Sequence, residues 1–309
     1  MTILKRFALP ADPVERGLTA AVIEGSLFNV WAGAVIGNYL TGAALLLGAQ
    51  GLALGVLGGL PAFATMLQLL SAPLVLGRGR PRNNLLVFSG LQRFAGALAG
   101  PIALLVGGPA AVPVFVGLHV FAWAWMAPGT VVWQGYMTDL VPPRVRGSYF
   151  SRRHVWSATA GIVAILLYGA ILARLPGVDG FKVLWAIAVV AAVLDTLAWL
   201  LHPDLPPGDV RTGRGFWETL RIPLQRPGPH RTASFFLAAW AFAQGLAAPF
   251  FPLAALELLR VPASSLAVLA TVASLASIAS AKVWGRWIDT AGHGRVLGLA
   301  TGLAAAVPL

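Results

Sequence analysis

The sequence predicts an all-α, polytopic membrane helix bundle, and three observations support this fold class. Of its 309 residues, 58% are hydrophobic and only 11% are charged, with a mean hydropathy of +0.78. This composition leaves too little polar surface for a water-soluble domain. Apolar runs of about 20 residues, the length that crosses a bilayer as a helix, recur along the whole chain. Short basic segments separate these runs, so we expect a protein embedded in lipid.

The apolar runs, bounded by charges or by Pro and Gly clusters, predict about nine transmembrane helices. They cover residues 17–47, 51–76, 84–107, 112–138, 154–173, 182–201, 233–256, 263–284 and 295–309. The segment 202–232 is polar and rich in proline, which is typical of a linker. We therefore expect an N-terminal six-helix bundle at 1–201, a cytoplasmic linker at 202–232 and a partial C-terminal bundle of three helices at 233–309.

The basic residues give this map an orientation. When the loops are assigned alternately to the two sides, eighteen of the 22 Lys and Arg fall on one side and three on the other, with Arg93 inside a helix. The eighteen are Lys5, Arg6, Arg16, Arg78, Arg80, Arg82, Arg144, Arg146, Arg152, Arg153, Arg211, Arg214, Arg221, Arg226, Arg231, Lys282, Arg286 and Arg295. Positive residues concentrate on the cytoplasmic side of membrane proteins. We expect a cytoplasmic N-terminus and a multi-pass protein of the cell inner membrane.

The composition also argues against several other classes of protein. The chain has no cysteine, and its five histidines have no metal-ligand spacing, so we expect no metal site and no cofactor. No Walker-type phosphate loop occurs, which argues against ATP hydrolysis. The net charge of +11 comes from residues scattered between apolar runs, so we expect no nucleic-acid partner. The sequence also has no cluster of acidic and basic residues of the kind that would indicate an enzyme, so we expect none.

Two sequence motifs resemble the major facilitator superfamily. The turn after the eighth predicted helix has the form Gly285-x-x-x-Asp289-x-x-Gly292-x-x-Arg295, and the turn between helices 4 and 5 contains Trp133-Gln134-x-x-x-x-Asp139 followed by Arg144-x-Arg146-Gly147. The run Gly58-Gly59-Leu60-Pro61 in the second helix is also similar to members of unassigned substrate. The corresponding first-half turn, residues 77–82, has the glycines and arginines but lacks the aspartate.

The resemblance implies two pseudo-repeated six-helix halves, of which the second is incomplete here because the chain reaches Leu309 inside its ninth apolar run. It implies a monomeric secondary active transporter that moves a small-molecule solute by alternating access, with a coupled proton or cation. Two alternatives remain open. One is a truncated remnant or scaffold that does not transport, and the other is a membrane-embedded lipid enzyme.

Ionisable and polar side chains inside the predicted helices are the binding candidates, because a charge near the bilayer centre usually faces a cavity or a partner. Glu24 in the first helix is a candidate for cation or proton binding, or else a carboxylate near the interface paired with Arg16. Arg93 in the third helix is a candidate for substrate contact or for pairing with an acid on another helix, and Asp195 has the same ambiguity. The remaining candidates are Asn29, Trp31, Asn38, Trp133 and Gln134, and such aromatic and amide groups suit an amphiphilic or organic-cation solute.

A second group of residues is expected to form a cytoplasmic gate. It comprises Asp139, Arg144, Arg146, Gly147, Gly285, Asp289, Gly292 and Arg295. Opposite charges at a helix end and at the next helix start can pair in one conformation and separate in another. We expect Asp289 to dock near the positive N-terminal end of the fifth helix.

Overall fold

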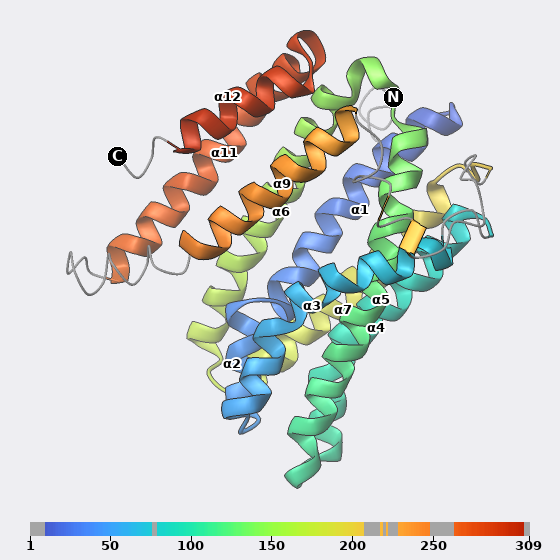
Figure 1. The fold of residues 1–309 in the computed structure, drawn as a ribbon. Helices are drawn as coiled ribbons and strands as arrows, with labels where there is room; N and C mark the ends of the chain where they lie inside the picture. Colours follow the sequence, from blue (N-terminus) through green and yellow to red (C-terminus); the bar gives the residue numbers. More distant parts are fainter. Residues whose placement is uncertain are drawn as a thin grey trace, which may run out of the picture. The chain divides into compact units, whose positions relative to one another are not determined.

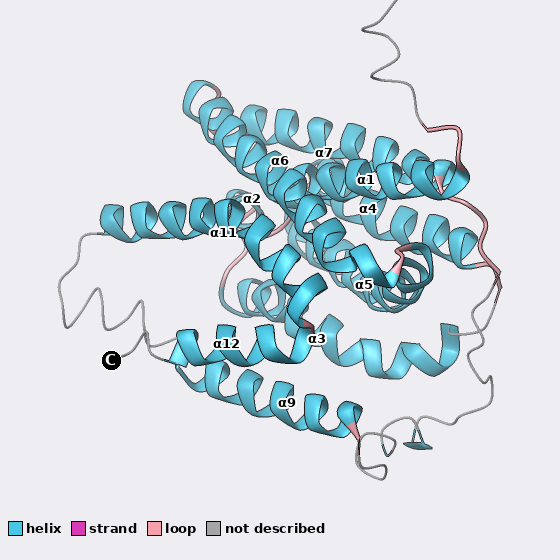
Figure 2. Ribbon diagram, turned by 90° about the horizontal axis from the view of Figure 1, so that it is seen from above, coloured by secondary structure: helices cyan, strands magenta, loops and turns pink. Residues whose placement is uncertain are grey.

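The computed structural model describes residues 10–75, 79–206, 217–218, 221, 228–247 and 263–305. Within these residues every regular element is a helix, as Figure 2 shows by colour. The chain divides into two compact units, one made of Met1–Thr212 with Ala281–Leu309 and the other of Gly213–Ser280. The candidate site described below lies entirely within the first unit.

Six helical stretches of the described chain are long and apolar enough to cross a membrane, as in a multi-pass membrane protein. The first consists of α1 (Pro13–Val35) and α2 (Asn38–Leu46). The others are α3 (Gly51–Val75), α4 (Pro81–Val106), α5 (Ala111–Leu140), α6 (Arg146–Arg174) and α7 (Val178–Ala198), with short 3₁₀ helices η2 (Gly108–Ala110), η3 (Pro143–Val145) and η4 (Trp199–Leu201) between or after them. The helical bundle and its first six spans are thus confirmed.

Three further helices fall on the other predicted spans. They are α9 (Pro229–Ala247), α11 (Ala263–Ala291) and α12 (His293–Ala305), and none of them is among the six candidate spans. Most of the predicted linker, residues 248–256 and residues 306–309 lie outside the described part of the chain. Nine spans and two repeated halves therefore stay predictions.

The start and the break of the first span follow from local sequence. The Asp12 side chain accepts a hydrogen bond from the Glu15 N–H at 2.8 Å, and Pro13 occupies the first helical position. The helix predicted as continuous over 17–47 is interrupted after Val35. Gly37 lies there with φ of 71°, a conformation that side chains disfavour, and α2 begins at the next residue.

Helix α1 occupies a central position in the first bundle. It packs against α6 on one side and α7 on another, while α7 also packs against α4, α4 against α5, and α5 against α3. Figure 1 shows α4 and α5 running side by side. The α4–α7 approach is very close, because a Cβ at Gly100 would overlap the indole ring of Trp185. Glycine is therefore required at this helix crossing.

Both the core and the surface of the bundle are rich in apolar side chains. Buried side chains such as Trp31, Phe115 and Trp185 form the largest hydrophobic cluster. Large hydrophobic residues are also exposed, for example Leu52 at 85% and Leu166 at 68%. Exposed apolar surface of this extent is typical of helices that face lipid.

Candidate functional site

Four charged side chains, three of them buried and one partly exposed, meet between the helices of the first bundle. They are Glu24 of α1, Arg93 of α4, Arg153 of α6 and Asp195 of α7, and we call them the charge cluster. Glu24 and Arg93 are each 4% exposed, and Asp195 is fully buried. Each charge thus comes from a different membrane-crossing helix, and the cluster joins all four.

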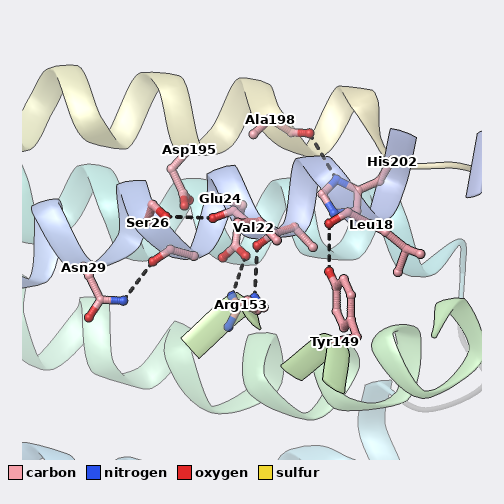
Figure 3. Close-up of polar contacts among 12 residues, drawn as sticks. Leu18, Val22, Glu24, Ser26, Asn29, Tyr149, Arg153, Asp195, Ala198 and His202 are labelled. Carbon is pink, nitrogen blue, oxygen red and sulfur yellow. Dashed lines mark hydrogen bonds and ion pairs between the residues drawn. The ribbon is translucent and has the colours of Figure 1, made fainter. Parts of the chain in front are cut away.

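The cluster is held by three contacts between opposite charges. Arg153 Nη2 lies 2.9 Å from Glu24 Oε2, and Arg93 Nε lies 3.0 Å from Asp195 Oδ2. Arg93 Nη2 lies 3.8 Å from Glu24 Oε1, so Glu24 bridges the two arginines. Figure 3 shows Arg153 extending from α6 to Glu24, with Asp195 beyond it. Two acids and two bases make the cluster neutral overall, which limits the cost of burying it.

Neighbouring groups hold the Arg93 side chain in place. The Arg93 guanidinium lies over the rings of Phe28 and Trp31, at 4.4 and 5.1 Å from their centroids, and it also donates to the Gln92 side chain. The Trp31 indole N–H donates in turn to the Arg93 carbonyl at 2.9 Å. Stacking and hydrogen bonding of this kind hold a guanidinium in one orientation.

Arg153 fits a notch in α1. Its Nε donates to the Ala21 carbonyl at 3.0 Å, and its ring contact is with Trp133, at 4.8 Å from the centroid. A Cβ at Gly25 would lie 2.5 Å from Arg153 Nη2, so a side chain there would force the guanidinium out of its present position. The α1 sequence therefore provides both the partner, Glu24, and the space beside it.

The charge cluster borders a cavity of about 430 Å³ between α1, α4, α5 and α6. The cluster members that line it are Glu24, Arg93 and Arg153, whereas Asp195 lies behind the wall. Its other lining side chains are mainly aromatic or small and polar, and include Phe28, Asn29, Ser89, Gln92, Thr130, Trp133, Phe150, Ser157 and Trp199. This volume is sufficient for a small organic molecule.

The structure brings four of the sequence-derived binding candidates together at this cavity: Glu24, Asn29, Arg93 and Trp133. Trp31 lies beneath Arg93 and outside the cavity lining. Asn38 and Gln134 are exposed and do not line the cavity either. The expected alternative partner of Glu24, Arg16, is not among its ion pairs in the described residues.

Sequence reasoning did not select Arg153 or Ser157. Arg153 was counted as an orientation signal together with Arg152, and nothing in the sequence shows which of two adjacent arginines faces inward. The available signal was Glu24, because an ionisable group inside a membrane helix usually faces a cavity or a partner on another helix.

A second polar site lies at the start of α6, where α11 ends. Asp289 Oδ1 accepts the Gly147 N–H at 2.7 Å, and Oδ2 accepts the Ser148 N–H at 2.8 Å and the Ser148 hydroxyl. A carboxylate here satisfies free N–H groups and lies at the positive end of the helix dipole. Burial acts to raise the pKa of Asp289, but the hydrogen bonds from Ser148 and Gly147 outweigh it, and the pKa is lowered from its ordinary value of 3.8.

Two glycines allow this contact. A Cβ at Gly147 would lie 2.6 Å from the Gly285 carbonyl oxygen and 2.7 Å from Asp289 Oδ1, and a Cβ at Gly285 would lie 2.6 Å from the Ser151 Cβ. The backbones of α6 and α11 therefore cross at a distance that side chains on these positions would prevent.

The other expected gate residues are arranged differently. Asp139 and Arg144 are exposed, and among the described residues Asp139 forms no ion pair. Arg146 Nη2 donates instead to the Thr138 carbonyl at 2.8 Å, at the C-terminal end of α5, where a cation stabilises the helix. Gly292, with φ of 84°, separates α11 from α12, and Arg295 is exposed.

The chain was compared with models of protein families and with curated proteins, and neither comparison finds a match. Within the described residues, no three His, Asp or Glu side chains are grouped so that they could hold a metal ion.

Proposed function

We propose that the chain is a secondary active transporter, similar to the major facilitator superfamily, that moves a small solute across the cytoplasmic membrane by alternating access. The observation that carries this proposal is a cavity bordered by buried, mutually paired charges inside membrane-crossing helices. Charges within a membrane protein usually mark a solute or ion pathway. The Lys and Arg distribution supports a cytoplasmic N-terminus and a cytoplasmic α5–α6 turn.

The Asp289 contact supports a gate in this transporter. Hydrogen bonds from two backbone N–H groups hold the carboxylate without any covalent or deeply buried link, so the contact can form and break. In the proposed cycle the contact holds the cytoplasmic side closed, and its release opens the cavity to the cytoplasm. A proton or another cation couples the movement to an ion gradient.

Thiol labelling tests alternating access, and the chain offers a clean background because it has no cysteine. Thr130→Cys places a thiol in the cavity lining, and Leu166→Cys places one on an exposed apolar surface. In sealed vesicles, we expect a membrane-impermeant maleimide to label Thr130→Cys. Adding Asp289→Ala should increase labelling from the cytoplasmic side about tenfold, which corresponds to the loss of about 1.4 kcal/mol from the closed state. Leu166→Cys should not react from either side.

An unreactive Thr130→Cys on both sides would contradict a solute pathway through this cavity. A labelling rate that Asp289→Ala leaves unchanged on both sides would remove Asp289 from the gate.

A further inference from the structure

We propose that the cavity binds a small organic anion, with its carboxylate at Arg153 and an apolar body among the aromatic rings. That this anion is the transported solute rests on the function proposed above, but binding of the anion does not depend on transport.

Arg153 is the member of the charge cluster that is most accessible. Its side chain is 18% exposed, compared with 5% for Glu24 and 5% for Arg93. Its Nε and Nη2 bind the Ala21 carbonyl and Glu24, which leaves the remaining edge of the planar guanidinium for another acceptor. A carboxylate matches that edge with two oxygens in the geometry that guanidinium groups prefer.

The cavity lining also contains donors without acceptors. Trp133 Nε1, Trp199 Nε1 and Ser157 Oγ are buried and have no hydrogen-bond partner in the described part of the chain. An indole N–H can only donate. Buried donors gain most from a ligand that supplies acceptors, and a carboxylate supplies several without adding a donor.

The carboxylates of the charge cluster are poorly placed to bind a cation. Glu24 has one oxygen 2.9 Å from Arg153 and the other 3.8 Å from Arg93, and Asp195 does not line the cavity. A cation in the cavity would be repelled by Arg93 and Arg153, and the carboxylates that could attract it are already bound to these arginines. The structure therefore favours an anion over the organic cation that the aromatic residues alone indicated.

The rest of the lining defines the body of the ligand. Trp133 and Phe150 lie edge to face, with ring centroids 6.2 Å apart, and Phe28 and Trp199 add further apolar surface. Such surfaces bind flat apolar groups. A carboxylate attached to one aromatic or alicyclic ring fits both the donors and the 430 Å³ volume.

Three probes of nearly equal shape test the charge requirement: benzoate, benzamide and benzamidinium, which are negative, neutral and positive. Binding to the whole chain in phosphatidylcholine nanodiscs is measured by titration calorimetry. We expect benzoate to bind at least about tenfold more tightly than benzamide, as one charged hydrogen bond predicts. We expect no binding of benzamidinium. Equal affinities for the three probes, or preference for benzamidinium, would overturn the proposal.

Variants test the position of the site. Arg153→Gln should weaken benzoate binding about tenfold or more, whereas Arg152→Gln, at the adjacent residue outside the cavity, should leave it unchanged. Glu24→Gln removes the carboxylate that competes for Arg153 and should tighten benzoate binding. If Arg153→Gln impairs folding, the double variant Glu24→Gln/Arg153→Gln removes the ion pair as a unit and should likewise weaken benzoate binding about tenfold or more. Unchanged affinity in both Arg153 variants would overturn the proposal.

Two further results separate this inference from others. Loss of benzoate binding when phosphatidylglycerol replaces phosphatidylcholine would assign the site to a lipid headgroup and overturn binding of a soluble anion. Benzoate binding in a protein whose Thr130→Cys thiol never changes accessibility would support this site while contradicting the transport function. Accessibility changes without any benzoate binding would have the reverse meaning.

Discussion

Replacing Asp195 by asparagine should destabilise the bundle by about 3 kcal/mol. The change preserves shape but removes the charge that faces Arg93 Nε at 3.0 Å. Removing one partner of a buried ion pair typically costs about 3–5 kcal/mol, because the other charge is left uncompensated. Glu24 remains 3.8 Å from Arg93 Nη2 and offsets part of that cost, so we expect the lower end of the range.

An exposed pair on the same helix provides the control. Asp179 and Lys182 of α7 lie 2.9 Å apart, as close as the buried pair, but their side chains are 76% and 59% exposed. Solvent-exposed pairs contribute little, so Asp179→Asn should cost about 0.5 kcal/mol or less. The free energy of unfolding is measured by titrating the protein in mixed micelles with sodium dodecyl sulfate and following helicity by circular dichroism.

The comparison of the two variants tests whether Asp195 and Arg93 form a buried ion pair. If Asp195→Asn costs no more than Asp179→Asn, Asp195 carries no charge in the folded protein and the ion-pair argument is refuted. A double variant with Arg93→Met should be more stable than Asp195→Asn alone, because it no longer buries an uncompensated guanidinium.

Two further predictions concern close contacts. Gly100→Ala should destabilise the bundle by about 2 kcal/mol because the added methyl group overlaps an indole ring, whereas Gly117→Ala, with open space at its Cβ, should cost nothing measurable in the same titration. Asp289→Ala should abolish the protection of the Gly147 and Ser148 amides against hydrogen exchange. Because the pKa of Asp289 is lowered on folding, the stabilisation by its carboxylate is present above pH 3.8 and is lost as the pH falls below that value. In the unsubstituted chain, the protection of the two amides, corrected for intrinsic exchange, should therefore disappear at low pH. Asp289→Ala should show no such dependence on pH. Protection that persists in Asp289→Ala, or that is independent of pH, would contradict the contact.

The helices were predictable because their signal is strong. A lipid-crossing helix needs about 20 apolar residues, and each of the first six predicted ranges overlaps an observed span. The largest error is the start of α6, expected at residue 154 and found at Arg146. Its basic first turns were interpreted as a loop, but the arginines there bind carbonyl oxygens and Glu24 without interrupting the helix. Charge alone therefore does not mark a helix end.

The site was predictable only in part. Glu24 and Arg93 stand out because charges inside apolar runs are rare. Their partners depend on how the helices pack, and the hydropathy pattern does not predict which helix faces pack together. Arg153 and Gln134 illustrate the limit, since one residue classed as a loop charge reaches Glu24 at 2.9 Å and one chosen as a ligand is exposed.

The charge cluster also constrains how the chain is inserted into the membrane. In the order of synthesis its members are Glu24, Arg93, Arg153 and Asp195, so their charges appear as minus, plus, plus and minus. Their running total never exceeds one unit and returns to zero once α7 has emerged. An unpaired charge at the bilayer centre costs about 2.5–3.5 kcal/mol on insertion scales. Arg93 has its nearer partner, Asp195 at 3.0 Å, only once α7 has been made, and until then Glu24, at 3.8 Å, is the counter-charge within reach. The last helix of the bundle to be made therefore completes the neutralisation of the first three.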